Sequence, residues 1–585
     1  MKAAGINQLW AKLMVAELVR CGVSNFCVSP GSRSTPLVLA VADNPDAHVS
    51  VHFDERGSAF RALGYAKATG KPAVAICTSG TAVANYYPAV VEASQSNTPL
   101  IIISADRPSE LRDTGAAQTI NQVNIFGNYL RWQVDIAPPD TQVSPSYLLS
   151  TVDHAFRMAA DGPVHLNCQF REPLAPLPEL QDFAAYLKPI ANWQEGQSVY
   201  TEYSAASSFT DTQVARVTAL AKSASRGVIV AGNLPANIDA TPILELAALW
   251  NWPVVADVGS GLRTSGQKSA NVICHADLYL RNERISELLK PDFVLQFGTT
   301  PISKHIAQFA ASASDAYVVV NAGNARVDPH HRVTHRIECE PAQFASDLLA
   351  SSGIKQSGLL DRFTKFDLLA QEALQKEVSG APTDPISELQ VASETARIVP
   401  TERGLFLATS MPIREFDCVA SPIEQRMHVA ANRGTNGIDG TIATAVGFAD
   451  GLELPTTLLI GDLAMLHDLN SLALVRQSRQ SITIVVLNND GGGIFSMLPI
   501  SESTSHFEEF FGTPHGLDFR NAAEMFGIKY HNPGTIKDFG TVYRHSLKSK
   551  KSSIIEVSCS RKENVRQHRQ LWKVVQERIE KYVAK

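Results

Sequence analysis

The chain has few of the features that mark secreted, membrane-spanning or nucleic-acid-binding proteins. Its 585 residues include only 8 cysteines, and none of them forms a CxxC pair, so neither a zinc site nor a disulfide framework is indicated. No apolar run approaches the ~20 residues of a membrane span, and the N-terminus lacks the basic and then apolar pattern of a signal peptide. The net charge of −6 gives no reason to expect nucleic acid as a partner. These absences predict a cytoplasmic globular protein.

Alternating strand and helix patterns divide the chain into three regions. Hydrophobic residues make up 44% of the sequence and charged residues 19%, which is enough for a sizeable core. We expect α/β domains at 1–185, 196–355 and 385–585, each a doubly wound parallel sheet, because short apolar strands recur between helical segments. The middle region has no GxGxxG sequence, so no dinucleotide site is predicted there.

The most informative motif places Asp462 and Asn489 just after two apolar runs, at 456–460 and 481–487. Such runs are typical of buried parallel strands, and residues 467–479 between them have helical spacing. One βαβ unit is therefore predicted. Both of its strands end at the edge where open α/β sheets bind ligands.

Three groups at this edge have the chemistry of Mg²⁺ ligands. Asp462 offers a carboxylate oxygen, Asn489 an amide oxygen and Gly491 a backbone carbonyl. Mg²⁺ takes hard oxygen ligands and usually shares them with phosphates. The glycines at 491–493 would let the backbone approach a diphosphate closely. The alternative is that these residues form ordinary turns at strand ends.

A carboxylate in the first region is a candidate proton donor. Glu55 follows an alternating strand pattern at 48–53 and opens an alanine-rich helix. Carboxylic acids are among the side chains that transfer protons in catalysis. The alternative is a surface glutamate at a helix N-terminus, where the helix dipole favours negative charge.

These motifs resemble those of the thiamine-diphosphate enzymes, whose pattern is Gly-Asp-Gly, a gap of about this length, and Asn-Asn. Here Leu463 stands in place of the third glycine. Within that group the chain resembles the 2-succinyl-5-enolpyruvyl-6-hydroxy-3-cyclohexene-1-carboxylate synthase family of menaquinone biosynthesis, from about residue 5 to about residue 535. The segments that carry this resemblance are 29–36, 53–57, 78–85, 104–108, 115–120, 432–434, 437–440 and 492–499.

The resemblance implies a reaction and its cofactors. The family decarboxylates 2-oxoglutarate on thiamine diphosphate with Mg²⁺ or Mn²⁺, and adds the succinyl carbanion to isochorismate. Glu55 and Gln118 match its catalytic positions. The positions that match its cofactor-binding residues are Glu55, Ser410, Ile438, Gly461, Asp462, Asn489, Gly491, Ile494 and Phe495, of which Asp462, Asn489 and Gly491 would bind the metal.

Both implied substrates carry several carboxylates, which guanidinium and ammonium groups bind well. The positions that match substrate-binding residues are Ser32, Arg33, Arg107, Gln118, Lys304, Arg414 and Arg433. By resemblance, Arg33 and Lys304 would bind isochorismate, while Arg414 and Arg433 would bind the far carboxylate derived from 2-oxoglutarate. The alternative for each arginine is an ordinary surface ion pair.

Two positions depart from the family pattern. His305 stands where an arginine often follows the lysine at 304, and a weakly charged histidine binds a carboxylate less firmly at pH 7. Asp490 stands where an asparagine is common, and it adds negative charge near the metal ligands.

The resemblance also implies an assembly. In the family the glutamate of one subunit faces the metal domain of another, so we expect a homodimer or a homotetramer with active sites at the subunit interface. Two other functions stay open from the sequence. One is a different thiamine-diphosphate enzyme, such as a 2-oxo acid decarboxylase or an acetolactate-type synthase, and the other is a non-enzymatic relative that only binds ligand.

Overall fold

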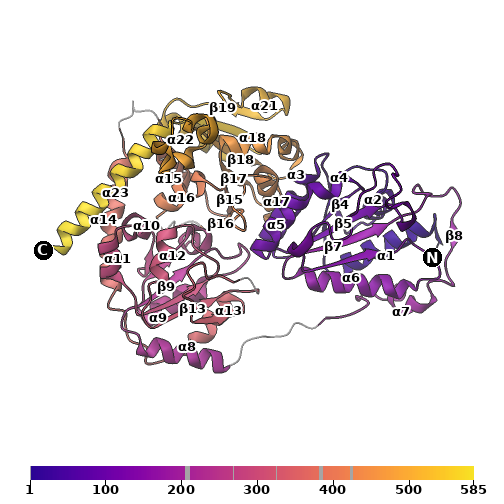
Figure 1. The fold of residues 1–585 in the computed structure, drawn as a ribbon, viewed down its shortest axis with the longest axis horizontal. Coiled ribbons are helices and arrows are strands. Elements are labelled where there is room, and N and C mark those ends of the chain that lie inside the picture. The colour runs from indigo at the N-terminus through magenta and orange to yellow at the C-terminus, as the bar shows by residue number, and fades with distance from the viewer. Residues whose placement is uncertain (1, 204–210, 268, 324–325, 381–385, 422–425) are drawn as a thin grey trace. The chain divides into compact units, whose positions relative to one another are not determined.

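Three six-stranded sheets organise the chain, and all neighbouring strands within each of them are parallel. The computed structural model describes residues 2–203, 211–267, 269–323, 326–380, 386–421 and 426–585 (Figure 1). By compactness the chain forms two units. The first is Met1–Ala206 with Asn432–Glu453 and His467–Arg479, and the second is Ser207–Ala431 with Leu454–Leu466 and Gln480–Lys585. The predicted α/β class with three doubly wound parallel sheets is confirmed.

The first unit contains the N-terminal sheet. In spatial order its strands are β3 (His48–Val51), β2 (Asn25–Val28), β4 (Ala73–Cys77), β5 (Leu100–Asp106), β7 (Pro163–Gln169) and β6 (Trp132–Ile136). One face is covered by α1 (Ile6–Arg20), α2 (Thr35–Ala42) and α6 (Pro145–Ala159). On the other side lie α3 (Glu55–Thr69), α4 (Thr81–Asn85) and α5 (Tyr87–Ser96). A short antiparallel pair, β1 (Lys2–Ala3) with β8 (Gln181–Asp182), and α7 (Ala191–Glu195) complete this part.

A helix from late in the sequence packs against α3 within the first unit. α17 (Thr441–Leu452) approaches α3 so closely that a Cβ added at Gly64 would overlap the Thr444 carbonyl oxygen. In the same way a Cβ at Gly447 would overlap the carbonyl oxygen of Arg61. Only glycine allows the two helix backbones to come this close.

The second unit contains the central sheet, with the spatial strand order β11 (Val272–Ile273), β10 (Val254–Ala256), β9 (Gly227–Ala231), β12 (Phe293–Phe297), β13 (Ala316–Val320) and β14 (His335–Ile337). α8 (Asp211–Ser223), α9 (Thr241–Trp250) and α13 (Pro341–Leu348) share the apolar core of one face. The core of the other face is shared by α10 (Ala276–Leu280), α11 (Glu283–Leu289), α12 (Lys304–Ala310), α14 (Leu360–Val378) and α23 (Arg561–Val583).

The C-terminal sheet also belongs to the second unit. Its spatial strand order is β16 (Met427–Ala430), β15 (Arg403–Leu407), β17 (Thr456–Gly461), β18 (Ile482–Asn488), β20 (Ser553–Ser558) and β19 (Lys529–His531). α15 (Glu388–Ile398), α16 (Met411–Val419) and α22 (Ile536–Lys548) share an apolar core with it, and the short helices α20 (Ile500–Ser503) and α21 (Arg520–Met525) follow β18. The strands of this sheet carry apolar side chains on both faces, so helices must cover both faces to keep these side chains from water.

The connection between β17 and β18 differs from the prediction of one helix at 467–479. It consists of α18 (Asp462–His467), a 3₁₀ turn at Leu469–Ser471 and α19 (Leu472–Gln477). The break falls at Asp468, whose carboxylate accepts hydrogen bonds from Ala443 N at 3.0 Å and from Ser471 Oγ at 2.7 Å. A side chain that bonds neighbouring backbone competes with helix continuation, and the apolar spacing does not reveal this. None of the described helices is both long and apolar enough to span a bilayer.

Candidate functional site

Asp462 and Gly491 are in direct contact at the ends of two paired strands. β17 and β18 run parallel with Gly461 opposite Leu487, so the chain leaves both strands at the same edge of the sheet. Gly491 N donates a hydrogen bond to Asp462 Oδ2 at 2.9 Å. The structure therefore brings the two halves of the predicted motif together.

The Asp462 carboxylate is buried, with 1% of the residue exposed, and two further donors hold it. Leu463 N donates to Oδ1 at 2.7 Å, and His515 Nε2 lies 3.2 Å from Oδ2. Leu517 N donates to His515 Nδ1 at 3.0 Å, so a neutral His515 carries its proton on Nε2 and donates to Asp462. A carboxylate has about four acceptor positions, so one remains open for a cation.

Asn489 presents a buried oxygen that suits a metal. Its Nδ2 donates to Glu388 Oε1 at 2.8 Å, while its Oδ1 has no hydrogen-bond partner among the described residues. Leaving such an oxygen unpaired costs roughly 1–3 kcal/mol, and a hard cation would remove that cost. Asp462, Asn489 and the Gly491 carbonyl fit Mg²⁺ or Mn²⁺ as ligands. No cluster of three His, Cys, Asp or Glu side chains suited to a metal occurs in the described part of the chain.

Glu388 belongs to a buried polar cluster behind Asn489. Glu415 Oε1 accepts hydrogen bonds from Asn564 Nδ2 at 2.9 Å and from His568 Nε2 at 3.0 Å. Burial, followed by the charge of Glu415, raises the pKa of Glu388. A protonated carboxyl still accepts a hydrogen bond through its carbonyl oxygen, so Glu388 holds the Asn489 amide in either protonation state.

The glycine at 491 is required by the protein's own packing. Its φ is +131°, and a Cβ there would overlap the Gly512 carbonyl oxygen. At Gly461, by contrast, a Cβ would meet only Pro412 Cγ at 4.0 Å. Glycine at 491 was predicted because it would admit a phosphate. The structure shows a second requirement, which is the close approach of the Gly512 backbone.

Ser410 lies at the same edge of the C-terminal sheet in an uncommon conformation. Its φ is +71° and its ψ is −129°, and α16 begins directly after it. Arg414 Nη1 donates to the Ser410 carbonyl oxygen at 2.5 Å, which supports the turn. Backbone held in such a region for a non-glycine residue is frequent at binding sites.

One cavity of about 390 Å³ gathers three of the predicted residues, Lys304, Arg414 and Ile494. Lys304 begins α12, Arg414 lies in the first turn and a half of α16, and Ile494 lies in the 3₁₀ helix Gly493–Met497. Phe495 does not line this cavity. The residue is 38% exposed, and its ring lies edge-on to the Phe511 ring, with centroids 6.0 Å apart.

In the first unit, Glu55 opens α3 as predicted. Asp54 caps this helix by accepting from Arg56 N at 3.0 Å. Asn85 Nδ2 donates to Glu55 Oε2 at 3.2 Å, and Oε1 has no donor within the described part of the chain. One oxygen of the carboxyl is therefore available to a ligand.

Two predicted arginines lie near each other in this unit. Arg33 is 6% exposed, donates from Nη1 to Phe170 O at 3.0 Å, and keeps a buried Nε without a described partner. Burial, followed by the charge of Arg107, lowers the pKa of Arg33. Arg33 Nη2 also lies 3.6 Å from Glu172 Oε1, an ion pair that offsets part of its charge. Ser32, beside Arg33, is exposed.

Ser79 connects Arg107 with Gln118. Arg107 Nη1 donates to Ser79 Oγ, and Gln118 Nε2 donates to Ser79 O at 3.0 Å. Gln118 is exposed and has a φ of +54°. The remaining predicted residues of this unit, Arg433 and Ile438, are half-buried in the loop that leads to α17.

Named relatives match nearly the whole chain, and three family models match parts of it. Three family models match: the N-terminal TPP binding domain of thiamine pyrophosphate enzymes at residues 10–125, the middle domain at 184–407, and the C-terminal TPP binding domain at 418–557. Proteins named 2-succinyl-5-enolpyruvyl-6-hydroxy-3-cyclohexene-1-carboxylate synthase are similar over nearly their full length. The one from Rubrobacter xylanophilus is 44% identical over 97% of this chain and 98% of its own. The one from Chlorobium phaeobacteroides is 42% identical over 99% of both chains, and the one from Salinibacter ruber is 42% identical over 98% and 97%.

The chain belongs to this synthase family of thiamine-diphosphate enzymes.

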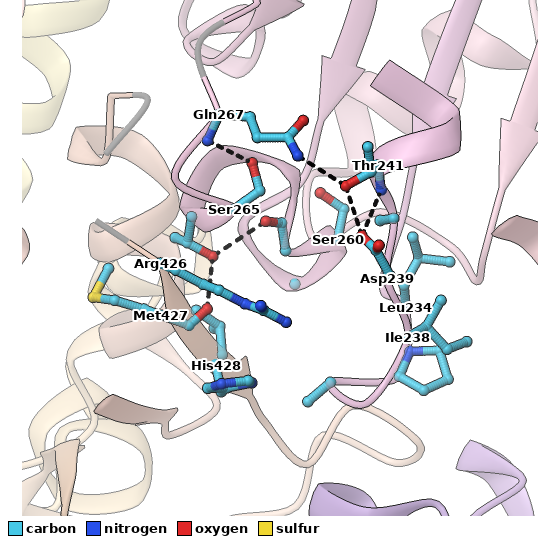
Figure 2. Close-up of a pocket in the computed structure, with 17 residues that line it drawn as sticks. Leu234, Ile238, Asp239, Thr241, Ser260, Ser265, Gln267, Arg426, Met427 and His428 are labelled. Carbon is cyan, nitrogen blue, oxygen red and sulfur yellow. Dashed lines mark hydrogen bonds between the residues drawn. The ribbon is translucent and has the colours of Figure 1, made fainter. Parts of the chain in front are cut away.

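Another cavity, in the second unit, lies apart from the residues that the family resemblance selected. It has a volume of about 180 Å³ and lies at the carboxyl ends of β9 and β10, with residues 426–429 on its other side (Figure 2). Several of its polar groups bond one another: Thr241 N donates to Asp239 Oδ1 at 3.0 Å, and Gln267 Nε2 donates to Thr241 Oγ1 at 2.9 Å. None of the predicted site residues lines it.

Sequence reasoning missed several side chains that contact the predicted residues or share a cavity with them. Glu388 and His515 hold the proposed metal ligands, and Arg281 and Trp572 line the cavity with Lys304. Glu388, His515 and Trp572 lie in segments that show no motif at all. Arg281 follows Asp277 at the i,i+4 spacing of a helical ion pair, a signal that by itself indicates only a salt bridge.

Proposed function

We propose that the chain decarboxylates 2-oxoglutarate and adds the resulting succinyl unit to isochorismate, giving 2-succinyl-5-enolpyruvyl-6-hydroxy-3-cyclohexene-1-carboxylate and CO₂ in menaquinone biosynthesis. The observation that carries this proposal is the 44% identity, over nearly the whole of both chains, to a relative named for this product. The buried and unpaired Oδ1 of Asn489 supports the metal and diphosphate part independently of that name.

The residues of the C-terminal sheet would bind the cofactor. Asp462, Asn489 and the Gly491 carbonyl would hold Mg²⁺ or Mn²⁺, and through it the diphosphate. When bound, thiamine diphosphate supplies the electron sink for decarboxylation. Glu388 and His515 keep the two ligand side chains in fixed orientations, which lowers the cost of binding the metal.

Glu55 would handle the proton that the chemistry requires. Its Oε1 is available, and Asn85 fixes the other oxygen at 3.2 Å. In this role the carboxyl donates its proton to the aminopyrimidine ring, and a glutamine could not do so. Glu55→Gln should therefore keep the fold and lose activity.

The cationic side chains would bind the substrate carboxylates. Lys304 and Arg414 line one cavity, whereas Arg33 and Arg107 lie in the first unit, where they donate hydrogen bonds to the neighbouring residues Thr78 and Ser79. We assign Arg33 and Lys304 to isochorismate, and Arg414 with Arg433 to the far carboxylate derived from 2-oxoglutarate. A simple 2-oxo acid such as pyruvate needs fewer cations, so a decarboxylase or an acetolactate-type synthase is less well supported.

The proposed active form is a homodimer or a homotetramer. Val49, Val51 and Phe53, close before Glu55, are 43%, 49% and 61% exposed, an apolar surface that a second copy would cover. Glu55 of one subunit would then serve the metal site of another. Analytical ultracentrifugation with activity measured across the same concentrations tests this, and a monomer with full activity would contradict it.

We further propose a role for each of the three domains and a cytoplasmic location for the protein. Residues 1–185 would bind the pyrimidine and 385–585 the diphosphate, while 196–355, the central α/β domain, would contribute Lys304 to the substrate cavity. The eight cysteines are all free thiols in the structure, six of them buried, which suits the reducing conditions of the cytoplasm.

The decisive experiment follows the absorbance of isochorismate with purified protein, thiamine diphosphate, Mg²⁺ and 2-oxoglutarate. We expect the absorbance to fall only when all components are present, and to stay constant for Glu55→Gln. Replacing 2-oxoglutarate by pyruvate should abolish the reaction. Release of CO₂ from 2-oxoglutarate without loss of isochorismate would overturn the acceptor assignment but keep the cofactor assignment.

A further inference from the structure

The cavity that contains Lys304 and Arg414 holds another arginine that no motif includes. Arg281 follows α10 directly and lines the cavity together with Lys304 and His305. The guanidinium carbon lies 3.7 Å from the centre of the Trp572 ring, a stacking contact that fixes the plane of the group.

Two of the three guanidinium nitrogens are used within the protein. Nε donates to Asp277 O at 3.1 Å, and Nη2 donates to Asp277 Oδ2 at 2.7 Å. Nη1 has no hydrogen-bond partner among the described residues. The side chain is therefore pre-oriented, with donors still available and 22% of its surface exposed.

The neighbouring histidine cannot take over this charge at neutral pH. Burial, and then the charges of Arg281 and Lys304, lower the pKa of His305, although Asp277 opposes the shift. With its pKa lowered, His305 adds little charge at pH 7, so the cations on this side of the cavity are Lys304 and Arg281, and the ion pair with Asp277 at 2.7 Å offsets part of the charge of Arg281. A substrate with two carboxylates needs more than one cation to balance it.

We propose that Arg281 is a substrate-binding residue that contacts a carboxylate of isochorismate beside Lys304. This inference rests on the proposed function, since it names a further ligand-binding group in the same site. Asp277 and Trp572 act as positioning residues, because the ion pair with Asp277 and the stacking contact with Trp572 hold the guanidinium plane.

The test compares Arg281→Gln with Arg284→Gln, an exposed arginine three residues further along the chain. For Arg281→Gln we expect KM for isochorismate to rise about 10- to 100-fold, the effect of losing a hydrogen bond to a charged group, while KM for 2-oxoglutarate changes less than about twofold. Arg284→Gln should leave both KM values unchanged. Adding His305→Arg to Arg281→Gln should restore part of the isochorismate affinity, because it returns a permanent charge to the same cavity.

Arg281→Met guards against a folding defect, since its unbranched stem can still pack on Trp572. The variant, Arg281→Gln or Arg281→Met, whose melting temperature is close to that of the unsubstituted protein should show the same rise in KM for isochorismate. An unchanged KM for isochorismate, or a rise confined to 2-oxoglutarate, would overturn the assignment of Arg281. If the unsubstituted protein fails to consume isochorismate at all, the proposed function fails instead, so the two failures can be told apart.

Discussion

Replacing Glu388 by methionine should weaken metal binding without unfolding the protein. Glu388 Oε1 is the acceptor for Asn489 Nδ2 at 2.8 Å, and this bond leaves the Asn489 Oδ1 aimed away from Glu388 and unpaired. Without that acceptor, the amide can rotate and present its NH₂ group where the oxygen should be. Loss of such a supporting contact typically lowers metal affinity 10- to 100-fold.

The effect on stability should be small, because removal of a buried acid is offset by the loss of the hydrogen bond from the buried Asn489 Nδ2. Glu388 is an acid buried beside the acid Glu415, and burial raises its pKa, so folding does not favour its charged form. Methionine has a similar length and no charge. A tenfold loss of affinity corresponds to about 1.4 kcal/mol of binding free energy, whereas the melting temperature of the metal-free protein should change little.

Calorimetric titration of Mg²⁺ in the presence of thiamine diphosphate measures this affinity directly. Glu388→Gln provides the matched control, because its amide oxygen can still accept from Asn489. We expect the unsubstituted protein to bind Mg²⁺ most tightly, Glu388→Gln less tightly, and Glu388→Met least tightly. Equal Mg²⁺ affinity for all three proteins would refute the positioning role, and a low melting temperature for Glu388→Met alone would indicate a structural role.

Three other predictions concern the first unit. Glu55→Gln should reduce turnover at least about 100-fold, as expected for loss of general acid–base catalysis, with an unchanged circular dichroism spectrum; near-normal turnover would exclude the proton role. Gly447→Ala should destabilise the protein by about 1–3 kcal/mol, because its Cβ overlaps the Arg61 carbonyl oxygen, and an unchanged denaturation midpoint would contradict that packing. Burial raises the pKa of Glu17 from its ordinary 4.5 to about 7. The folded state then holds the proton more tightly, so the free energy of unfolding should fall as pH rises between these values; Glu17→Gln should flatten this slope in urea titrations at several pH values.

The fold class and the metal motif could be predicted because both follow from local pattern. Buried β-branched runs at 456–460 and 481–487 form β17 and β18, and the residues after them meet at one edge of the sheet. Spacing of two strand ends is enough to place Asp462 and Asn489 near each other. No knowledge of distant packing is needed for this step.

The supporting residues could not be predicted because long-range packing places them. Glu388 lies about 100 residues before Asn489 in the chain, and Trp572 lies even further from Arg281. The break at Asp468 was missed for a related reason, since its hydrogen bond to Ala443 joins separate parts of the sequence. Apolar periodicity reports which face of an element is buried, but not which polar side chain will meet it.

The contact between α3 and α17 has a consequence for how the chain folds during its synthesis. The ribosome completes α3 at Thr69, but α17, which packs against the glycine-containing surface of α3, is complete only at Leu452. At about 5–20 residues per second, the ribosome needs on the order of tens of seconds to supply that partner. The first sheet therefore emerges with an unfinished helix surface, and an N-terminal fragment ending at Ala206 would expose the same surface permanently. Such a fragment should need a chaperone, or the missing helix added as a peptide, to stay in solution.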